Sequence, residues 1–173
     1  LVWRENPGRI VELYTQWSHL AKGGGKTAVT LLYGSMYGNT EAAMNAVGQG
    51  ISREGVEVDI FDAARTHASY ILPSLWQNAG VMIGAPTYEG SLFPPVKEVI
   101  EMARKKAIRN KHAAMFGSYG WSGGALKEFR SLAHDLKWEI ADTLEFAGGP
   151  TKTDLKNAEI FGANFAQALM SQA

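Results

Sequence analysis

The sequence predicts an α/β domain built on a doubly wound, five-stranded parallel sheet. After residue 25, short apolar segments that fit strands alternate five times with amphipathic segments that fit helices. Such alternation favours a parallel sheet with helices on both faces. The segments VTLLY (29–33) and GVMIGA (80–85) are almost continuously apolar, as expected for central strands that are buried on both sides. A chain of 173 residues suits one domain of this kind.

A helix and a linker precede this domain. The segment ENPGRIVELYTQWSHLA (5–21) begins with a cap residue, Asn6, and has Pro7 at the first helical position. Its apolar face would contain Ile10, Val11, Tyr14 and Trp17. Because the glycines at 23–25 form a flexible linker, we divide the chain into an N-terminal helical segment, 1–25, and an α/β domain, 26–173.

Within the domain, strands and helices follow one another in a regular order. The strands are predicted at 28–33, 56–61, 81–85, 113–117 and 139–146. Four helices are indicated by apolar residues that recur on one face: Met44, Val47 and Ile51; Val96, Val99, Ile100 and Ala103; Leu126, Phe129, Ala133 and Leu136; and Leu155, Ala158, Gly162, Phe165 and Leu169. A further helix at 69–77 is the weakest prediction, because Pro73 falls inside it.

The composition excludes several classes of function. Lys plus Arg equals Asp plus Glu at 17 each, so no excess charge would attract nucleic acid or an anionic membrane. The chain has no cysteine, which excludes disulfides and thiolate metal sites and agrees with a cytoplasmic location. The four histidines are scattered, and we expect no metal site in this chain.

The segment YGSMYGNT (33–40), between the first strand and the next helix, suits a phosphate group. Amides at a helix N-terminus, at the positive end of the helix dipole, bind anions without a cationic side chain. Ser35, Asn39 and Thr40 add polar donors, and Gly38 allows a close backbone approach. The loop lacks the lysine of a nucleotide hydrolase, so we expect a phosphate monoester that stays intact. The alternative is a capped helix with no ligand.

A second candidate phosphate site, GGGKT (23–27), does not fit the P-loop pattern. Leu20 stands where that pattern requires glycine, and the segment precedes a strand instead of following one. A dinucleotide fingerprint GxGxxG is also absent after the first strand.

Two further loops lie at the carboxyl ends of predicted strands. APTYEGSLFPP (85–95) is long for a strand-to-helix connection, and its Glu89-Gly90 pair suggests a turn with positive φ at Gly90. SYGWSGGA (118–125) places two aromatic residues among small ones. It also matches the serine-hydrolase motif GxSxG, but the only later histidine, His134, is predicted in the middle of a helix and out of reach. Either loop alone could simply pack on the surface.

Together the three loops predict a site for one particular kind of molecule. The carboxyl ends of parallel strands meet at one edge of the sheet, which brings the phosphate loop next to two glycine-rich aromatic walls. A ligand with a phosphate at one end and a planar ring at the other fits this arrangement, and FMN is the candidate.

The motifs YGSMYGNTE, GAPTYEGSLFPPV and FGSYGWSGGA resemble the flavodoxin-like domain of flavodiiron proteins, also called A-type flavoproteins. The resemblance runs from Leu1 to the C-terminus. Even LVWRENPGRIVELYTQW is similar to the segment that joins the diiron domain of that family to its flavin domain. The resemblance implies that residues 1–25 follow a diiron domain that is missing from this chain.

The resemblance also implies the flavodoxin strand order 2-1-3-4-5 and a set of FMN contacts. The phosphate would be held by Ser35, Met36, Tyr37, Gly38, Asn39 and Thr40, and the ring would be flanked by Pro86, Thr87, Tyr88, Glu89, Gly90, Ser118, Tyr119, Gly120, Trp121, Ser122 and Gly123. Trp121 and Tyr88 would bound the ring, and Glu89 beside it would disfavour the negatively charged reduced flavin. No catalytic residue is expected in this chain.

In that family the flavin takes electrons from rubredoxin or a similar carrier. It passes them to a diiron centre, in the same or a partner subunit, that reduces dioxygen or nitric oxide. The resemblance therefore implies an electron-transfer domain of an oxidoreductase that is a homodimer or larger assembly. Two alternatives stay open: a self-contained electron carrier or NAD(P)H:quinone reductase of flavodoxin-like fold, and a phosphate-binding regulatory domain.

Overall fold

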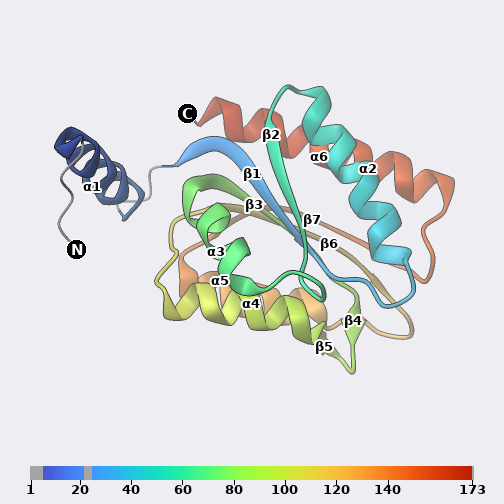
Figure 1. Ribbon diagram of the computed structural model, residues 1–173. Helices are drawn as coiled ribbons and strands as arrows, with labels where there is room; N and C mark the ends of the chain where they lie inside the picture. The colour runs from blue at the N-terminus through green and yellow to red at the C-terminus, as the bar shows by residue number, and fades with distance from the viewer. Residues whose placement is uncertain (1–5, 22–24, 173) are drawn as a thin grey trace.

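The computed structural model, which describes residues 6–21 and 25–172, contains a five-stranded parallel sheet between two helical layers (Figure 1). In spatial order the strands are β2 (Glu57–Asp62), β1 (Lys26–Tyr33), β3 (Asn78–Gly84), β6 (His112–Tyr119) and β7 (Glu139–Ala147). Each neighbouring pair is parallel. Counting only these strands, the order is 2-1-3-4-5, which confirms the predicted fold.

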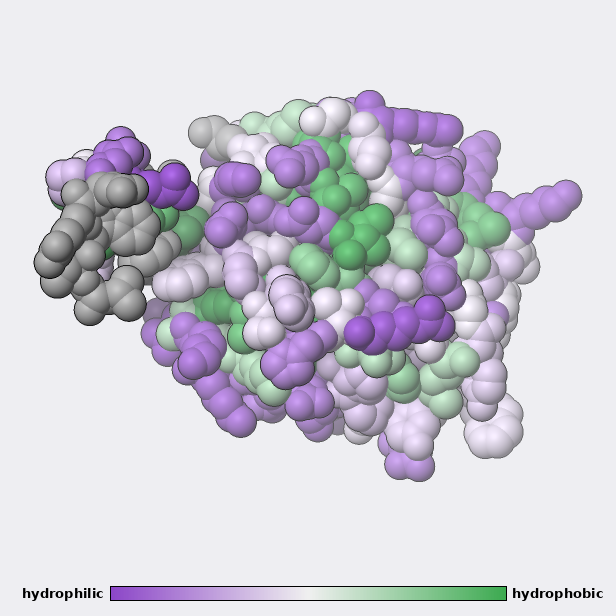
Figure 2. Space-filling model, in the orientation of Figure 1, coloured by the Kyte–Doolittle hydropathy of each residue, from purple (hydrophilic) through white to green (hydrophobic). Residues whose placement is uncertain are grey.

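The burial of the strands follows their position in the sheet. The apolar strands β1, β3 and β6 lie in the centre and are buried along nearly their whole length, whereas β2 and β7 are edge strands with many exposed or half-buried residues. Figure 2 shows an apolar area on the face where β2 runs in front, and Ile60 of this strand is 46% exposed. The prediction that VTLLY and GVMIGA form central strands is therefore confirmed.

The helices divide into two layers. On one face of the sheet lie α2 (Asn39–Arg53) and α6 (Lys152–Ser171), and on the other lie α3 (Ala68–Gln77), α4 (Pro94–Lys105) and α5 (Ala125–Leu136) (Figure 1). Each layer encloses its own apolar cluster against the sheet. Because the central strands contribute side chains to both clusters, they are held on both faces, and their carboxyl ends form a fixed edge.

The weakest of the predicted helices is present. α3 continues through Pro73, although proline removes one backbone hydrogen bond and strains a helix interior. Its neighbours Ile71 and Leu75 are fully buried, and the Ser74 hydroxyl donates to Asp59 Oδ2 at 2.7 Å. These tertiary contacts offset the unfavourable local effect of the proline.

The N-terminal helix α1 (Pro7–Ala21) also begins where the sequence predicts. On its apolar face, Val11 and Tyr14 are each 64% exposed; the Trp17 side chain and the first two glycines of the predicted linker lie outside the described residues. Among the described helices, none is both long and apolar enough to cross a membrane.

Candidate functional site

A cleft of about 310 Å³ opens at the carboxyl-end edge of the sheet, where the sequence predicts a site. Loops that follow β1, β3, β6 and β7 supply its walls. Its lining consists of Ser35, Met36, Tyr37, Asn39, Thr40, Pro86, Thr87, Tyr88, Glu89, Ser118, Tyr119, Gly120 and Gly148. The structure therefore brings all three predicted loops together and adds a fourth.

The first wall is the N-terminus of α2, which begins without a side-chain cap. Gly38 occupies the capping position with φ 84°, a left-handed conformation that favours glycine. Its amide donates to Ser35 Oγ at 3.0 Å, which fixes the turn. Among the described residues, no side chain caps the first-turn amides. Amides in this position, at the positive end of a helix dipole, are able to bind an anion.

Thr40, in the first turn of α2, has a buried hydroxyl with no partner. The residue is 1% exposed and lines the cleft. Within the described part of the chain, its Oγ1 atom makes no hydrogen bond. Buried hydroxyls are nearly always satisfied, because an unpaired one costs about 1–3 kcal/mol. A phosphate oxygen at this helix terminus would supply the partner, so the residues present fit a phosphate group.

The second wall is a small hairpin that the sequence analysis did not predict as strands. β4 (Thr87–Tyr88) pairs antiparallel with β5 (Ser91–Leu92). Both turn residues have positive φ, 48° at Glu89 and 73° at Gly90, which is typical of a type I′ hairpin turn. The predicted positive φ at Gly90 is confirmed. The Tyr88 ring meets the Phe93 ring edge to face, with centroids 6.2 Å apart.

The third wall is formed by the last two residues of β6, Ser118 and Tyr119, and by Gly120 directly after it. It approaches the second wall closely at the base. A Cβ atom on Gly117 would lie 1.9 Å from the Ala85 carbonyl oxygen, so only glycine allows the ends of β3 and β6 to come this near. This close approach sets the hairpin beside the end of β6, with Tyr88 on the hairpin and Tyr119 on the strand.

Five of the predicted contact residues do not line the cleft: Gly38, Gly90, Trp121, Ser122 and Gly123. Gly38 and Gly90 act through their backbone conformation, one in each turn. Trp121 is fully exposed, at 105%, in the loop that leads from the third wall into α5. The structure therefore places this indole outside the lining of the cleft, on a loop that continues from its wall.

The fourth wall, after β7, was missed by the sequence analysis. Gly148 lines the cleft with φ 65°, and its amide donates to the Tyr119 carbonyl at 2.8 Å. A Cβ atom on Gly149 would lie 3.4 Å from Asn39 Oδ1. The glycine pair in AGGPT, directly after the last strand, was the available signal, since every strand of a parallel sheet ends at the same edge.

The charge of the cleft is low. Among the lining residues only Glu89 carries a charge, and none is lysine or arginine. The described residues contain no group of three or more His, Asp or Glu side chains that could hold a metal ion. His67 accepts the Ser69 amide at the start of α3, whereas His134 of α5 lies beside Asp135 on the surface.

The arrangement suits a molecule that is anionic at one end and flat at the other. The α2 terminus offers amides and a hydroxyl to an anion, whereas the hairpin and the 118–120 segment offer tyrosines and backbone groups to a ring. Aromatic side chains favour contact with a planar conjugated system.

Comparison with known proteins agrees with this geometry. The family model for flavodoxin matches residues 31–162. The chain is 33% identical over 169 residues to the anaerobic nitric oxide reductase flavorubredoxin of Escherichia coli, covering 96% of this chain and 35% of that protein. A protein of the same name from Enterobacter sp. is 34% identical, with 34% of its length covered. The chain thus spans about a third of the length of these curated relatives.

Solved structures show the same likeness. A flavodiiron core from Synechocystis sp. PCC6803 is 30% identical, with a TM-score of 0.80 over 98% of this chain and 42% of that one. The rubredoxin oxygen:oxidoreductase of Desulfovibrio gigas has a TM-score of 0.86 over 94% of this chain and 40% of that one, at 23% identity. The second likeness is one of fold alone.

Proposed function

The chain belongs to the flavodoxin family, whose cofactor is FMN, and from that premise we propose that it is the electron-transfer domain of a larger flavodiiron oxidoreductase. Its electrons would come from a reduced carrier such as rubredoxin and pass to a diiron centre that reduces dioxygen or nitric oxide. The names of two similar proteins, a nitric oxide reductase flavorubredoxin that is 33% identical and a flavodiiron core that is 30% identical, support this assignment. The diiron domain would lie outside residues 1–173.

The uncapped helix end with its buried, partnerless Thr40 hydroxyl is the observation that carries the proposal. The amides of Asn39 and Thr40, with the Thr40 hydroxyl, would hold the FMN phosphate. Ser35 would keep the turn in shape, since its Oγ accepts the Gly38 amide. Because this site relies on helix amides, it needs no cationic side chain.

The two tyrosine-bearing walls would hold the isoalloxazine ring. Tyr88 and Tyr119 would exclude water from its faces, and the backbone of Thr87–Tyr88 would offer hydrogen-bonding groups to its polar edge. Trp121, which now stands in solvent, would close over the exposed part of the ring. We regard all seventeen residues named in the sequence analysis as FMN contacts or supports in this proposal.

The protein would bind, orient and shield the cofactor. FMN, when bound, supplies one- and two-electron redox chemistry. Glu89, the one charge in the cleft lining, would oppose the accumulation of negative charge on the ring and so lower its reduction potential. The edge of the cleft that remains open would face the electron donor and acceptor in turn.

Titration with FMN tests the proposal. We expect the purified chain to bind one FMN, to quench its fluorescence and to show a flavin absorbance spectrum that dithionite bleaches. Reduced rubredoxin should bleach the same spectrum, whereas NADH alone should not. A lack of FMN uptake would contradict the proposal, and rapid bleaching by NADH would favour the quinone-reductase alternative.

A further inference from the structure

We propose that Glu128 is a positioning residue that holds the β4–β5 hairpin in the geometry that the flavin requires. Glu128 lies on α5, outside the lining of the cleft. The inference rests on the proposed function, because the hairpin is a wall of the cleft in which FMN would bind.

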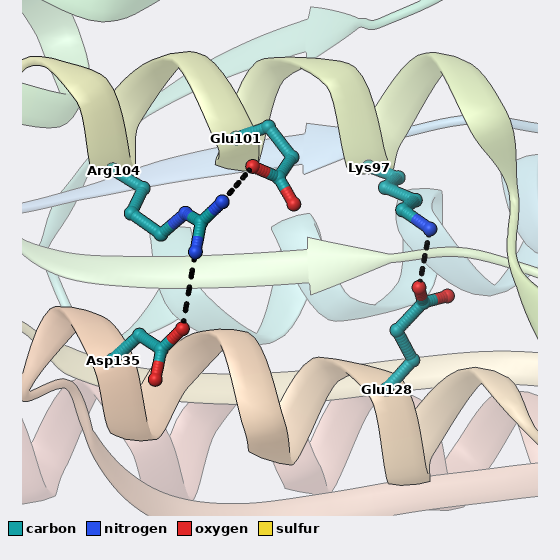
Figure 3. Close-up of polar contacts among 5 residues, drawn as sticks. All are labelled: Lys97, Glu101, Arg104, Glu128 and Asp135. Carbon is teal, nitrogen blue, oxygen red and sulfur yellow. Dashed lines mark hydrogen bonds and ion pairs between the residues drawn. The ribbon is translucent and has the colours of Figure 1, made fainter.

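One carboxylate joins three elements at this point. Glu128 Oε2 accepts the backbone amide of Leu92, in β5, at 2.8 Å. Its other oxygen, Oε1, pairs with Lys97 Nζ, on α4, at 2.5 Å. Figure 3 shows this second contact, with Lys97 and Glu128 reaching toward each other from the two helices. The side chain therefore fixes the end of the hairpin to both helices beneath it.

The hairpin depends on such contacts because it has little stability of its own. It forms a separate two-stranded sheet with two residues in each strand, and isolated hairpins are marginally stable at best. Its other supports also come from the start of α5. The Ala125 amide donates to Thr87 Oγ1 at 3.3 Å, and Gly124 lies against the Gly90 carbonyl so closely that a Cβ atom there would be 2.1 Å from the oxygen.

The charge state of Glu128 agrees with this role. Burial raises the pKa of this carboxyl, but the hydrogen bond from Lys97 and the bond from the Leu92 amide lower it more, so that the pKa lies below the ordinary 4.5. The group is therefore ionised at neutral pH, and hydrogen bonds to an ionised acceptor are stronger than neutral ones. The Lys97 side chain is 43% exposed, and solvent screens that pair. The Leu92 bond is the contact that acts on the hairpin itself.

A second ion pair between the same helices supplies a matched control. Arg104 of α4 contacts Asp135 of α5 at 3.3 Å and Glu101 at 2.7 Å (Figure 3). Asp135 pairs with Arg104 and His134, neither of which belongs to the hairpin. Loss of this pair would alter the contact between α4 and α5 without altering the hairpin.

The first test measures FMN dissociation constants for Glu128→Ala, Glu128→Gln and Asp135→Ala in the full chain. We expect Glu128→Ala to bind FMN about tenfold more weakly, since it loses a hydrogen bond to a charged group. Glu128→Gln should recover most of the affinity, because its side-chain carbonyl still accepts the Leu92 amide. Asp135→Ala should bind as the unaltered chain does. Equal weakening by Asp135→Ala, or no recovery with glutamine, would overturn the proposal.

The second test needs no FMN. Amide hydrogen exchange in the flavin-free protein should become faster at Leu92 and across the hairpin in Glu128→Ala, but not in Asp135→Ala. Unchanged exchange at Leu92 would overturn the positioning role even if the chain binds FMN. If the exchange result is as expected but the unaltered chain takes up no FMN, the proposed function fails and Glu128 merely supports a loop.

Discussion

Two buried threonines of this fold differ in what their hydroxyls contact. Thr30, in β1, has its Oγ1 atom 2.7 Å from Ser74 Oγ and accepts Asn78 Nδ2 at 3.1 Å. Thr40, in the first turn of α2, has a hydroxyl with no partner in the described chain. A satisfied hydroxyl contributes to stability, whereas an unsatisfied one costs free energy that binding can recover. We therefore interpret Thr30 as a structural residue and Thr40 as a residue that would contact the ligand.

Substitution of each threonine by valine tests this distinction. Thr40→Val should leave the flavin-free protein as stable as before or about 1 kcal/mol more stable, while FMN affinity falls about tenfold. Thr30→Val should lower the free energy of unfolding by about 1–3 kcal/mol and leave FMN affinity unchanged. Urea denaturation and FMN titration measure the two effects. Loss of stability in Thr40→Val without loss of affinity would remove Thr40 from the phosphate site.

We expect the stability of the folded chain to depend on pH through His112, at the start of β6. The residue is buried, both ring nitrogens lack a partner among the described residues, and the ring stacks on Phe165 at 5.2 Å. Burial lowers the pKa of this imidazole, and nearby Glu139 only partly opposes the change. As pH falls below the ordinary value of 6.5, the unfolded chain gains a proton that the folded chain resists, so stability falls.

The change His112→Leu should flatten this profile. We expect the free energy of unfolding to decline less between pH 7 and pH 5 than in the unaltered chain, by at most about 1.4 kcal/mol per pH unit. Urea denaturation at several pH values checks it. Identical slopes for His112→Leu and the unaltered chain would show that His112 does not titrate in this range.

At the scale of elements, a second glycine besides Gly117 sets how closely two walls of the cleft approach each other. Gly124 precedes α5 and packs on the carbonyl of Gly90, in the hairpin turn. Gly124→Ala should force the two loops apart, weaken FMN binding about tenfold and lower stability by about 1–3 kcal/mol.

Gly48→Ala, inside α2, is the matched control. Its Cβ would meet Ile60 at 3.4 Å, an ordinary contact. Alanine there should raise stability by about 0.5–1 kcal/mol without changing FMN affinity. Fluorescence titration measures the FMN affinity of Gly124→Ala and Gly48→Ala, and thermal unfolding measures their stability. Unimpaired binding by Gly124→Ala would mean that the walls can adjust freely.

The sequence predicted the strands and helices well because their apolar patterns match their burial. The buried strands β1 and β3 are visible as continuous apolar runs in the sequence, and the helices α4 and α5 as apolar residues that recur on one face. The β4–β5 hairpin shows no such pattern, because two residues per strand are too few for an alternation of apolar and polar residues to be recognised. Its Glu89-Gly90 turn was readable, since positive φ favours glycine.

The residues of the site were harder to predict where their roles depend on contacts between residues far apart in the sequence. The loops after β1, β3 and β6 could be grouped because parallel strands end at one edge. Gly148 follows β7 and could have been grouped with them by the same rule, but its hydrogen bond to Tyr119, on a different strand, could not be read from the sequence. Glu128 was missed because its partners Leu92 and Lys97 lie 36 and 31 residues away in sequence, and no local pattern marks it.

At the scale of the whole molecule, size alone does not distinguish the cleft. A second hollow of about 350 Å³, similar to the 310 Å³ of the cleft, lies between the 63–68 loop and α4. Its lining includes Arg65, Glu98 and Met102. The second hollow has neither the uncapped helix terminus nor the tyrosines that line the cleft. The chemistry of the lining, not the volume, leads us to assign FMN to the cleft.

A hydrogen-exchange map of the chain with and without FMN tests this assignment across the molecule at once. Binding stabilises the folded state by about 2.7 kcal/mol when free FMN is 100 times its dissociation constant. Beyond that general effect, protection should concentrate in the loops at 35–40, 86–92, 119–124 and 148–149, because these lose mobility when the ligand joins them. The 63–68 loop, which lines the second hollow, should gain only the general protection. Stronger protection at 63–68 than at 35–40 would place the flavin on the other side of this sheet edge and refute the phosphate site at the start of α2.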